Sequence, residues 1–204
     1  MTERYIDRAY AARDPEEIRE IYEGWAATYE SDITAQGYAT PERGAETLAQ
    51  FMADKDAPIL DMGCGTGLSG VALKAAGFTT IDGADTSAAM LQEAGKKSIY
   101  RNLLQVEPDE DLPFRAGNYA AITAIGVIGP GAAPISLFDA LMHKLTKGGK
   151  LLFSLNDHAM VDSGTLGMIH EWTDCGAALL LSSEDGPHLP GMDLNATVYL
   201  IEKN

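Results

Sequence analysis

The feature of the sequence that most constrains its fold is a glycine-rich turn, Gly63-Cys64-Gly65-Thr66-Gly67, which directly follows the short apolar run 59–62. Glycine adopts positive φ angles and lets a ligand approach the backbone closely. A helical pattern at 68–76 comes next, so this segment predicts the first strand–turn–helix crossover of a parallel sheet, a place where ligands bind. A tight turn without a ligand is the less favoured alternative, because three alternating glycines exceed what a turn requires.

Strands and helices alternate after this turn. We expect further strands at 79–84, 103–106, 119–125 and 150–155, and helices at 87–97 and 134–146. This alternation predicts a parallel sheet covered by helices on both faces. A helix at 165–174 precedes two last strands, 177–182 and 196–202, which have no helix between them and should form an antiparallel hairpin. The predicted fold is a Rossmann-like, doubly wound α/β sheet of seven strands, mostly parallel.

The segment before the first strand predicts two helices. The run Asp14-Pro15-Glu16-Glu17 has the residues of a helix start, and Thr40-Pro41-Glu42 begins a second helix. The first helix carries one apolar face, made of Ile18, Ile21, Tyr22, Trp25 and Tyr29. We expect residues 1–56 to form a helical lid or appendage and residues 57–204 a cofactor-binding core, within one structural domain.

The charge of the chain bears on its partners. Fifteen Lys and Arg residues against thirty Asp and Glu residues give a net charge of −15. Phosphate backbones and anionic membrane surfaces attract basic proteins, so we expect neither nucleic acid nor membrane as a partner. The charged N-terminus lacks the apolar core of a secretory signal, and two cysteines are too few for a disulfide framework or a zinc site. These features predict a cytoplasmic protein without a metal.

Two kinds of ligand fit the glycine-rich turn. The run 65–70 matches the dinucleotide fingerprint G-x-G-x-x-G, and Asp85 lies twenty residues beyond its first glycine. However, Asp61 at the end of the first strand can reach a ligand ammonium group. The terminal order of helix and hairpin is also not that of a nicotinamide-binding domain. Both features favour a ligand other than a nicotinamide dinucleotide.

Four motifs occur in a familiar order: Ile59-Leu60-Asp61-Met62-Gly63-Cys64-Gly65-Thr66-Gly67, then Ile81-Asp82-Gly83-Ala84-Asp85-Thr86-Ser87 with Met90-Leu91, then Leu112-Pro113-Phe114, and Leu145-Thr146-Lys147-Gly148-Gly149-Lys150-Leu151-Leu152. From about residue 20 to 204 the chain resembles the class I S-adenosylmethionine-dependent methyltransferases, although Lys147 stands where proline is commoner. The run Tyr22-x-x-Trp25-Ala26-x-x-Tyr29-Glu30 looks like the lid helix of a small-molecule branch, which includes the methyltransferase-like proteins of the Williams–Beuren region.

The resemblance implies a site for S-adenosylmethionine and its product S-adenosylhomocysteine. Asp61 would meet the ammonium group, and Asp85 the ribose hydroxyls. The other implied contacts are the loop backbone along the methionine end, the adenine contacts, the border of the reacting methyl and the closing lid: Gly63, Cys64, Gly65, Thr86, Met90, Asp109, Ile125, Gly126, Trp25 and Tyr29. Asp109 is chosen from several acids at 107–111. Structural roles remain open for Asp61 and Asp85 as helix-capping carboxylates, for Met90 as a core residue, and for Trp25 and Tyr29 as ordinary helix packing.

The implied activity is in-line transfer of a methyl group to a small-molecule acceptor. No side chain is assigned as catalytic, because alignment and desolvation of the acceptor can supply most of the acceleration. His158 and His188 are possible bases, but surface histidines in loops are common, so neither is assigned. Two alternatives stay open: a cofactor-binding or regulatory module without catalysis, and a nicotinamide-dependent oxidoreductase.

Overall fold

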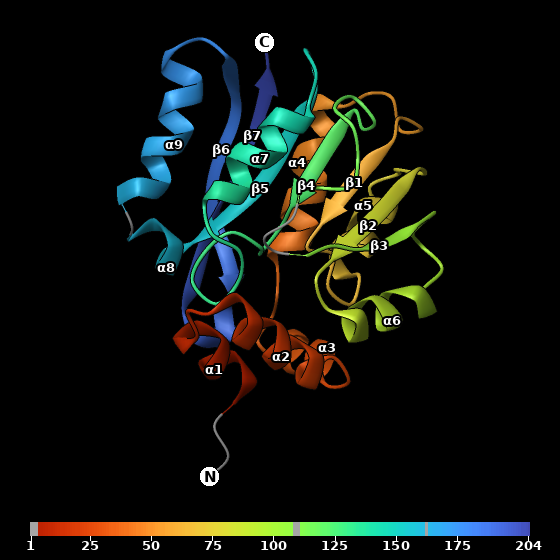
Figure 1. Cartoon of the computed structure of the whole chain (residues 1–204), viewed down its shortest axis with the longest axis vertical. Helices are drawn as coiled ribbons and strands as arrows, with labels where there is room; N and C mark the ends of the chain where they lie inside the picture. The colour runs from red at the N-terminus through yellow and green to blue at the C-terminus, as the bar shows by residue number, and fades with distance from the viewer. Residues whose placement is uncertain (1–3, 108–110, 162) are drawn as a thin grey trace.

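A central sheet of seven strands organises the structure, a computed structural model that describes residues 4–107, 111–161 and 163–204 (Figure 1). The strands lie in the order β3-β2-β1-β4-β5-β7-β6. The first five are parallel, whereas β7 pairs antiparallel with both β5 and β6. Their bounds are β1 Ile59–Met62, β2 Ile81–Asp85, β3 Leu103–Gln105, β4 Ala121–Ala124, β5 Lys150–Asn156, β6 Ala178–Leu189 and β7 Leu194–Lys203. The predicted fold class is confirmed.

The direction of chain winding reverses beside β1. This strand pairs with β2 on one side and with β4 on the other, so the loops that leave β1 and β4 diverge to opposite faces of the sheet. A crevice therefore forms at the carboxyl ends of the strands, where parallel α/β sheets bind ligands. All residues of β1 and β4 are buried, which makes the floor of this crevice rigid.

Helices cover both faces of the sheet. Ile59 packs in a cluster with α4 (Thr40–Phe51) and α5 (Leu68–Ala75), while the next residue, Leu60, packs on the opposite face against α7 (Ser136–Lys144). The remaining elements beside the sheet are α6 Ala88–Lys96, α8 Asp157–Met160, α9 Ser163–Asp174 and the 3-10 helix η1 Pro190–Met192. Helix α4 thus belongs to the layer on the sheet, and the expectation that it lies with the N-terminal appendage is wrong.

Three N-terminal helices gather at one end of the sheet, clearly separate from the layers in Figure 1. They are α1 (Tyr5–Ala11), α2 (Pro15–Trp25) and α3 (Tyr29–Ala35), and together with Leu189 they form a small core of their own. The Asp14 carboxylate accepts hydrogen bonds from the amides of Glu16 and Glu17 at 2.9 and 3.1 Å, as the predicted helix start requires. The expected single helix through Tyr29 is divided, because α2 ends at Trp25.

The C-terminal hairpin extends further than the sequence pattern indicated. Strand β6 continues to Leu189, through a segment that we expected to be a polar loop. The Arg43 guanidinium of α4 donates hydrogen bonds to the carbonyl oxygens of Glu184, Pro187 and Ala196 and fastens this extension to the sheet layer. The long hairpin carries its tip to the N-terminal helices. No helix in the described ranges combines the length and apolarity needed to cross a membrane.

Candidate active site

A large cavity lies at the carboxyl ends of β1, β2 and β4, with an empty volume of about 1480 Å³ that includes its open mouth. The glycine-rich turn and the ends of the strands form its floor, and residues of α2 and α3 lie across it. The residues that line the cavity include Gly63, Gly65, Asp85, Met90, Glu107 and Gly126. The cavity therefore occupies the place that the strand order reserves for a ligand.

Two glycines of the turn serve different purposes. Gly63 has a φ of +68°, and a Cβ atom there would lie 2.3 Å from the Val127 side chain, so packing demands glycine. Gly65 has a φ of +52°, but a Cβ atom would meet no protein atom within 4 Å. Because Gly65 lines the cavity, that open space belongs to the volume a ligand would use.

Asp85 ties the second strand to the turn. One carboxylate oxygen accepts from the Gly65 amide at 2.8 Å, and the other accepts from the Ser87 amide at 2.9 Å. Burial raises the pKa of Asp85, and hydrogen bonds from backbone amides oppose that shift. Ser87, not Asp85, caps α6 through its side chain, accepting from the Met90 amide at 3.1 Å. The half-buried Asp85 lines the cavity, which suits its predicted role, and that role stays a prediction.

Asp61 lies beneath the cavity and not in its wall. Its carboxylate is fully buried and accepts hydrogen bonds from the hydroxyl groups of Ser69, Tyr100 and Thr123 at 2.6, 2.6 and 2.9 Å. Burial raises its pKa, and these three donors oppose the shift. Through these hydrogen bonds Asp61 links β1 to α5 and β4. Because the carboxylate is buried and bonded to three hydroxyl groups below the cavity wall, the structure does not place it for the predicted contact with a ligand ammonium group.

Most of the other residues predicted to contact the cofactor line the large cavity. Cys64, Thr86, Met90, Ile125 and Gly126 all line the cavity. Burial raises the pKa of the Cys64 thiol, which agrees with a backbone role and not with a nucleophile. The prediction for Asp109 falls outside the described residues. A neighbouring acid that we had not chosen, Glu107, does line the cavity.

A second, smaller chamber adjoins the cavity, with an empty volume of about 590 Å³ that includes open solvent. Tyr22, Tyr29, Tyr38, Gly126 and Ala132 border both spaces and form their common boundary. We call this second space the inner chamber. Its wall also contains Ile6, Ala9, Tyr10, Trp25, Ile33, Ile128, Gly129, Pro130, Ser154, Asn156, His188 and Leu189.

The aromatic residues predicted to close over the cofactor take unequal positions. Tyr29 borders both spaces, whereas Trp25 borders the inner chamber only. The Trp25 ring packs edge-on to Tyr29 with centroids 4.8 Å apart, and its Nε1 donates to Asp32 at 2.8 Å. Trp25 thus supports the lid from within. Both assignments as cofactor contacts remain predictions.

The two histidines also differ. His158 is exposed on α8 and contacts the Tyr10 ring, with no part in either wall. His188 is buried in the wall of the inner chamber, and its Nδ1 lies 2.7 Å from the Thr40 hydroxyl. Burial, aided by the positive charge of Arg43, lowers the pKa of His188 to about 4. The imidazole is therefore neutral at pH 7.

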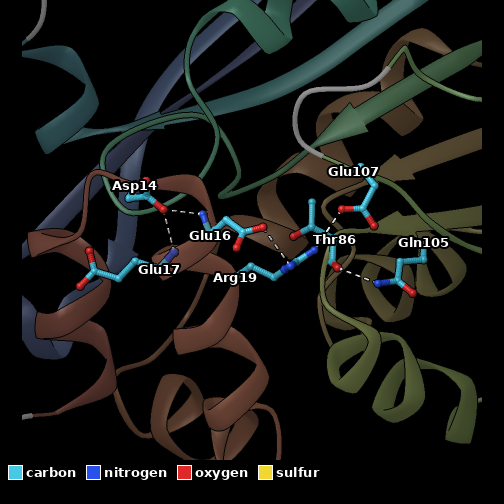
Figure 2. Close-up of polar contacts among 7 residues, drawn as sticks. All are labelled: Asp14, Glu16, Glu17, Arg19, Thr86, Gln105 and Glu107. Atoms are coloured by element: carbon cyan, nitrogen blue, oxygen red, sulfur yellow. Dashed lines mark hydrogen bonds and ion pairs between the residues drawn. The ribbon is translucent and has the colours of Figure 1, made fainter.

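The charged groups of the large cavity are acidic. Among the described residues of its wall, Asp85 and Glu107 carry charge, and neither Lys nor Arg is present. Arg19 approaches from α2 above the opening, where it bonds Glu107 at 3.0 Å and Glu16 at 3.2 Å; Figure 2 shows this arginine bridging the lid and the end of β3. Beside it, the Gln105 side chain donates to the Thr86 carbonyl oxygen at 3.2 Å. This cavity suits a ligand that carries positive charge and hydroxyl groups.

Several wall residues had no signal in the sequence. Tyr38, Ser154 and Asn156 line the inner chamber, yet they come from three distant segments without a motif. Tyr22 appeared only as part of the lid pattern. The sequence signal for Glu107 was the acidic run 107–111, which does not show which of its acidic residues faces the ligand.

Comparison with known proteins shows the family to which this chain belongs. Residues 36–193 match the family described as a methyltransferase domain. Methyltransferase-like protein 27 of Homo sapiens is 31% identical over 150 residues, covering 72% of this chain and 60% of that protein. A probable 18S rRNA (guanine-N(7))-methyltransferase of Dictyostelium discoideum is 31% identical over 122 residues, covering 54% of this chain and 42% of that protein. The chain thus matches no more than three fifths of the length of these relatives.

Solved structures share the fold at low identity. The [4+2]-cyclase SpnF has a TM-score of 0.70 at 14% identity, covering 94% of this chain and 97% of that chain. Magnesium protoporphyrin IX methyltransferase from Synechocystis PCC 6803, solved with bound S-adenosylhomocysteine, has a TM-score of 0.65 at 14% identity, covering 94% and 100%. These likenesses concern the fold alone.

The relatives correct one prediction from the sequence. Proteins named as 18S rRNA (guanine-N(7))-methyltransferases from Bos taurus and yeast match as well, at 30% and 32% identity. The expectation that nucleic acid is excluded as a partner is therefore wrong. Net charge sums the whole surface, whereas the base that such an enzyme modifies is held by the local lining of a pocket.

Proposed function

This chain belongs to the class I S-adenosylmethionine-dependent methyltransferase family, and on that basis we propose that it transfers a methyl group from S-adenosylmethionine to a small-molecule acceptor. When bound, S-adenosylmethionine supplies a methyl group activated by a positively charged sulfonium sulfur. The proposal assigns the large cavity to this donor and the inner chamber to the acceptor. The observation that carries it is the common boundary of the two spaces, where donor and acceptor groups would meet.

The residues of the large cavity fit the donor. The open space above Gly65 leaves room for a ligand against the backbone, and Asp85 offers carboxylate oxygens that can accept from hydroxyl groups. S-adenosylmethionine carries a sulfonium and an ammonium charge against a single carboxylate, so its overall charge is positive and suits the acidic lining. In this proposal Gly63, Gly65 and Asp85 bind the donor, while Met90 provides an apolar surface in the same wall.

Three loop amides are already paired, which leaves fewer donors for a dinucleotide. A pyrophosphate is normally held by free backbone N–H groups at such a turn. Here the Gly63 and Cys64 amides donate to the Ala84 carbonyl oxygen, and the Gly65 amide donates to Asp85. The acidic lining would also repel phosphate groups. The nicotinamide oxidoreductase is accordingly the weaker alternative.

The boundary residues position the acceptor. Gly126 has a φ of +71°, and a Cβ atom there would lie 2.4 Å from the Tyr38 hydroxyl oxygen, so glycine lets Tyr38 pack against this turn at the boundary. The Gly126 amide donates to Ser154 at 2.8 Å, which fixes this turn after β4. Tyr22 and Tyr29 lie over the boundary and exclude water from it. Alignment and desolvation of this kind accelerate methyl transfer without a catalytic side chain.

A guanine base of RNA is the second candidate acceptor. It is favoured by the three relatives that are named for methylation of 18S rRNA at guanine N7. An aromatic ring nitrogen would suit an aromatic wall. Entry of a base would require the lid helices to open far enough to admit a polynucleotide.

Incubation with S-adenosylmethionine and a metabolite library tests the proposal, with formation of S-adenosylhomocysteine as the readout. A parallel reaction contains ribosomal RNA. Turnover that depends on a small molecule supports the proposal, and turnover with RNA alone replaces it by the second candidate. Binding of S-adenosylhomocysteine without turnover on either set would support the non-catalytic module.

A further inference from the structure

The wall of the inner chamber has a composition that restricts the acceptor. Among its described residues there is no Asp, Glu, Lys or Arg. Its titratable imidazole, His188, is neutral at pH 7 because burial lowers its pKa to about 4. A carboxylate or phosphate group buried here would lack an ionic partner, which is strongly unfavourable.

Aromatic rings make up much of the same wall. Tyr22 and Trp25 stack with centroids 5.8 Å apart, and the Trp25 ring meets Tyr29 edge-on. Tyr10 and Tyr38 complete the set of five. Such rings present flat apolar faces to a flat ligand, and their π-electrons attract a neighbouring positive charge. They therefore suit a reaction in which an uncharged acceptor meets the positively charged sulfonium group.

Within this wall, His188 offers a hydrogen-bonding atom with no partner in the described part of the chain. Its Nδ1 lies 2.7 Å from the Thr40 hydroxyl, and the ring packs perpendicular to the Tyr38 ring with centroids 5.3 Å apart. These two contacts fix the imidazole and leave Nε2 without a bond to any described residue. Asn156 is engaged at both ends: its Oδ1 accepts from the Ala159 amide and its Nδ2 donates to the Tyr10 hydroxyl at 3.4 Å. Ser154 Oγ accepts from the Gly126 amide and keeps its own O–H as a donor, so His188 Nε2 is the ring nitrogen of the described wall that is left to bind a ligand.

We infer that the inner chamber binds an uncharged aromatic acceptor and that His188 Nε2 anchors a polar substituent of that acceptor. The inference rests on the proposed function and names the substrate class of its second space. In the reaction a lone pair on a ring nitrogen of the acceptor forms a bond to the methyl carbon. The carbon–sulfur bond breaks, and its electron pair stays on sulfur. Such a nitrogen loses no proton, so no base is needed, and the positive charge passes to the methylated ring among the aromatic side chains.

Two pairs of single-ring probes test the substrate class, each pair made of an uncharged amide and the matching carboxylate. Nicotinamide and benzamide are uncharged, whereas nicotinate and benzoate have nearly the same shape and carry a carboxylate. Each is titrated into the protein saturated with S-adenosylhomocysteine, with binding followed by saturation-transfer NMR. We expect the amides to bind at least tenfold more tightly than the carboxylates. Equal or tighter binding of the carboxylates, or no binding of either amide, would overturn the inference.

Two variants test the anchor. His188→Gln keeps an amide group near the place of Nε2, whereas His188→Asn keeps one near Nδ1. We expect His188→Gln to hold nicotinamide within about threefold of the parent affinity and His188→Asn to lose at least tenfold. Equal affinities in the two variants contradict the role of Nε2.

A measurement on the unchanged protein covers the case in which a variant fails to fold. The imidazole ¹⁵N signals of His188 are followed during titration with nicotinamide, and Nε2 should shift more than Nδ1. No shift at Nε2 rejects the anchor. The affinity for S-adenosylhomocysteine is recorded first, because its absence contradicts the proposed function, whereas its presence with a preference for carboxylates contradicts this inference alone.

Discussion

Asp85 and Gly65 act as a pair at the residue scale. The carboxylate holds the Gly65 amide, and the glycine leaves the space above the turn open. A charged group bound to a backbone N–H orders the loop before a ligand arrives, which lowers the entropic cost of binding. The pair links the second strand to the first turn, and through them the sheet determines the shape of the cavity.

Replacing Asp85 should weaken cofactor binding and leave the fold intact. Asp85→Ala removes acceptors for ligand hydroxyl groups as well as the restraint on Gly65, and charged hydrogen bonds contribute about 1.5–3 kcal/mol. We expect the Kd for S-adenosylhomocysteine to rise by one to two decades in calorimetry. Asp56→Ala, which removes a carboxylate bonded to Thr79 outside the cavity wall, is the control and should bind normally. Unchanged affinity in Asp85→Ala would remove this residue from the site.

The two glycines of the turn should respond differently to substitution. Gly65→Val places a side chain in open space that the ligand would use, so it should abolish binding of S-adenosylhomocysteine; valine is also strained at a φ of +52°, so some loss of stability accompanies this. Gly63→Ala places a methyl group against Val127 and should instead lower the free energy of unfolding by about 1–3 kcal/mol. Urea unfolding and calorimetry on both variants separate the effects. Normal binding by Gly65→Val would show that the turn is not the cofactor site.

His188 should make stability depend on pH. The imidazole takes up a proton near pH 6.5 in the unfolded chain but only near pH 4 in the folded protein. Its stabilising contribution is therefore complete above pH 6.5 and is lost as the pH falls toward 4, by up to about 3 kcal/mol. Urea unfolding at pH 7.5 and 4.5 should show a larger loss for the parent protein than for His188→Gln. Equal losses would mean that His188 titrates normally in the fold.

At the scale of elements, polar contacts around the large cavity join α2 and α3 to the core. Arg19 of α2 bonds Glu107, and Glu23 of α2 accepts from the Ala89 amide of α6 at 3.1 Å. Glu30 of α3 pairs with Lys97, which also donates to the Thr66 carbonyl oxygen of the glycine turn at 2.7 Å. The exposed pair of Arg19 with Glu107 contributes at most about 1 kcal/mol, so most of the attachment of α2 and α3 comes from the apolar cluster that they share with Leu189.

Hydrogen exchange should detect opening of the lid helices. We expect the segment from Ile18 to Tyr29 to gain protection when S-adenosylhomocysteine binds, since Ile18, Tyr22 and Tyr29 border the cavity. Arg19→Ala should raise exchange in α2 of the free protein. The matched control is Lys96→Ala, which breaks a pair with Glu93 inside α6. Equal protection of α2 with and without ligand would mean that the lid is a fixed part of the core.

The bounds of helices and strands were predictable where local hydrogen bonds set them, and not where distant residues do. The start of α2 was predictable because Asp14 caps it through local hydrogen bonds. Helix α1 was not, because its Ncap residue, Arg4, makes no capping hydrogen bond and Ile6 is buried by packing against distant residues. The extension of β6 to Leu189 was missed for the same reason, since Arg43 from another element binds its carbonyl oxygens.

At the scale of the whole molecule, the mostly parallel sheet with its terminal hairpin and a ligand site at the glycine-rich turn were predictable, while the inner chamber was not. The glycine turn and Asp85 lie on adjacent strands, so their meeting follows from the strand order alone. The inner chamber is built from side chains such as Tyr38, Asn156 and His188, which only the complete fold brings together. The net charge of −15 was equally uninformative about the acceptor, because it describes the surface and not a pocket.

The central claim is that the large cavity binds S-adenosylmethionine and its product. Calorimetric titration of the unchanged protein with S-adenosylhomocysteine, and separately with NAD, tests it most directly. We predict one S-adenosylhomocysteine bound per chain, no heat of binding with NAD, and loss of the S-adenosylhomocysteine signal in Gly65→Val. Binding of NAD in preference to S-adenosylhomocysteine, or S-adenosylhomocysteine binding that survives in Gly65→Val, would contradict the account.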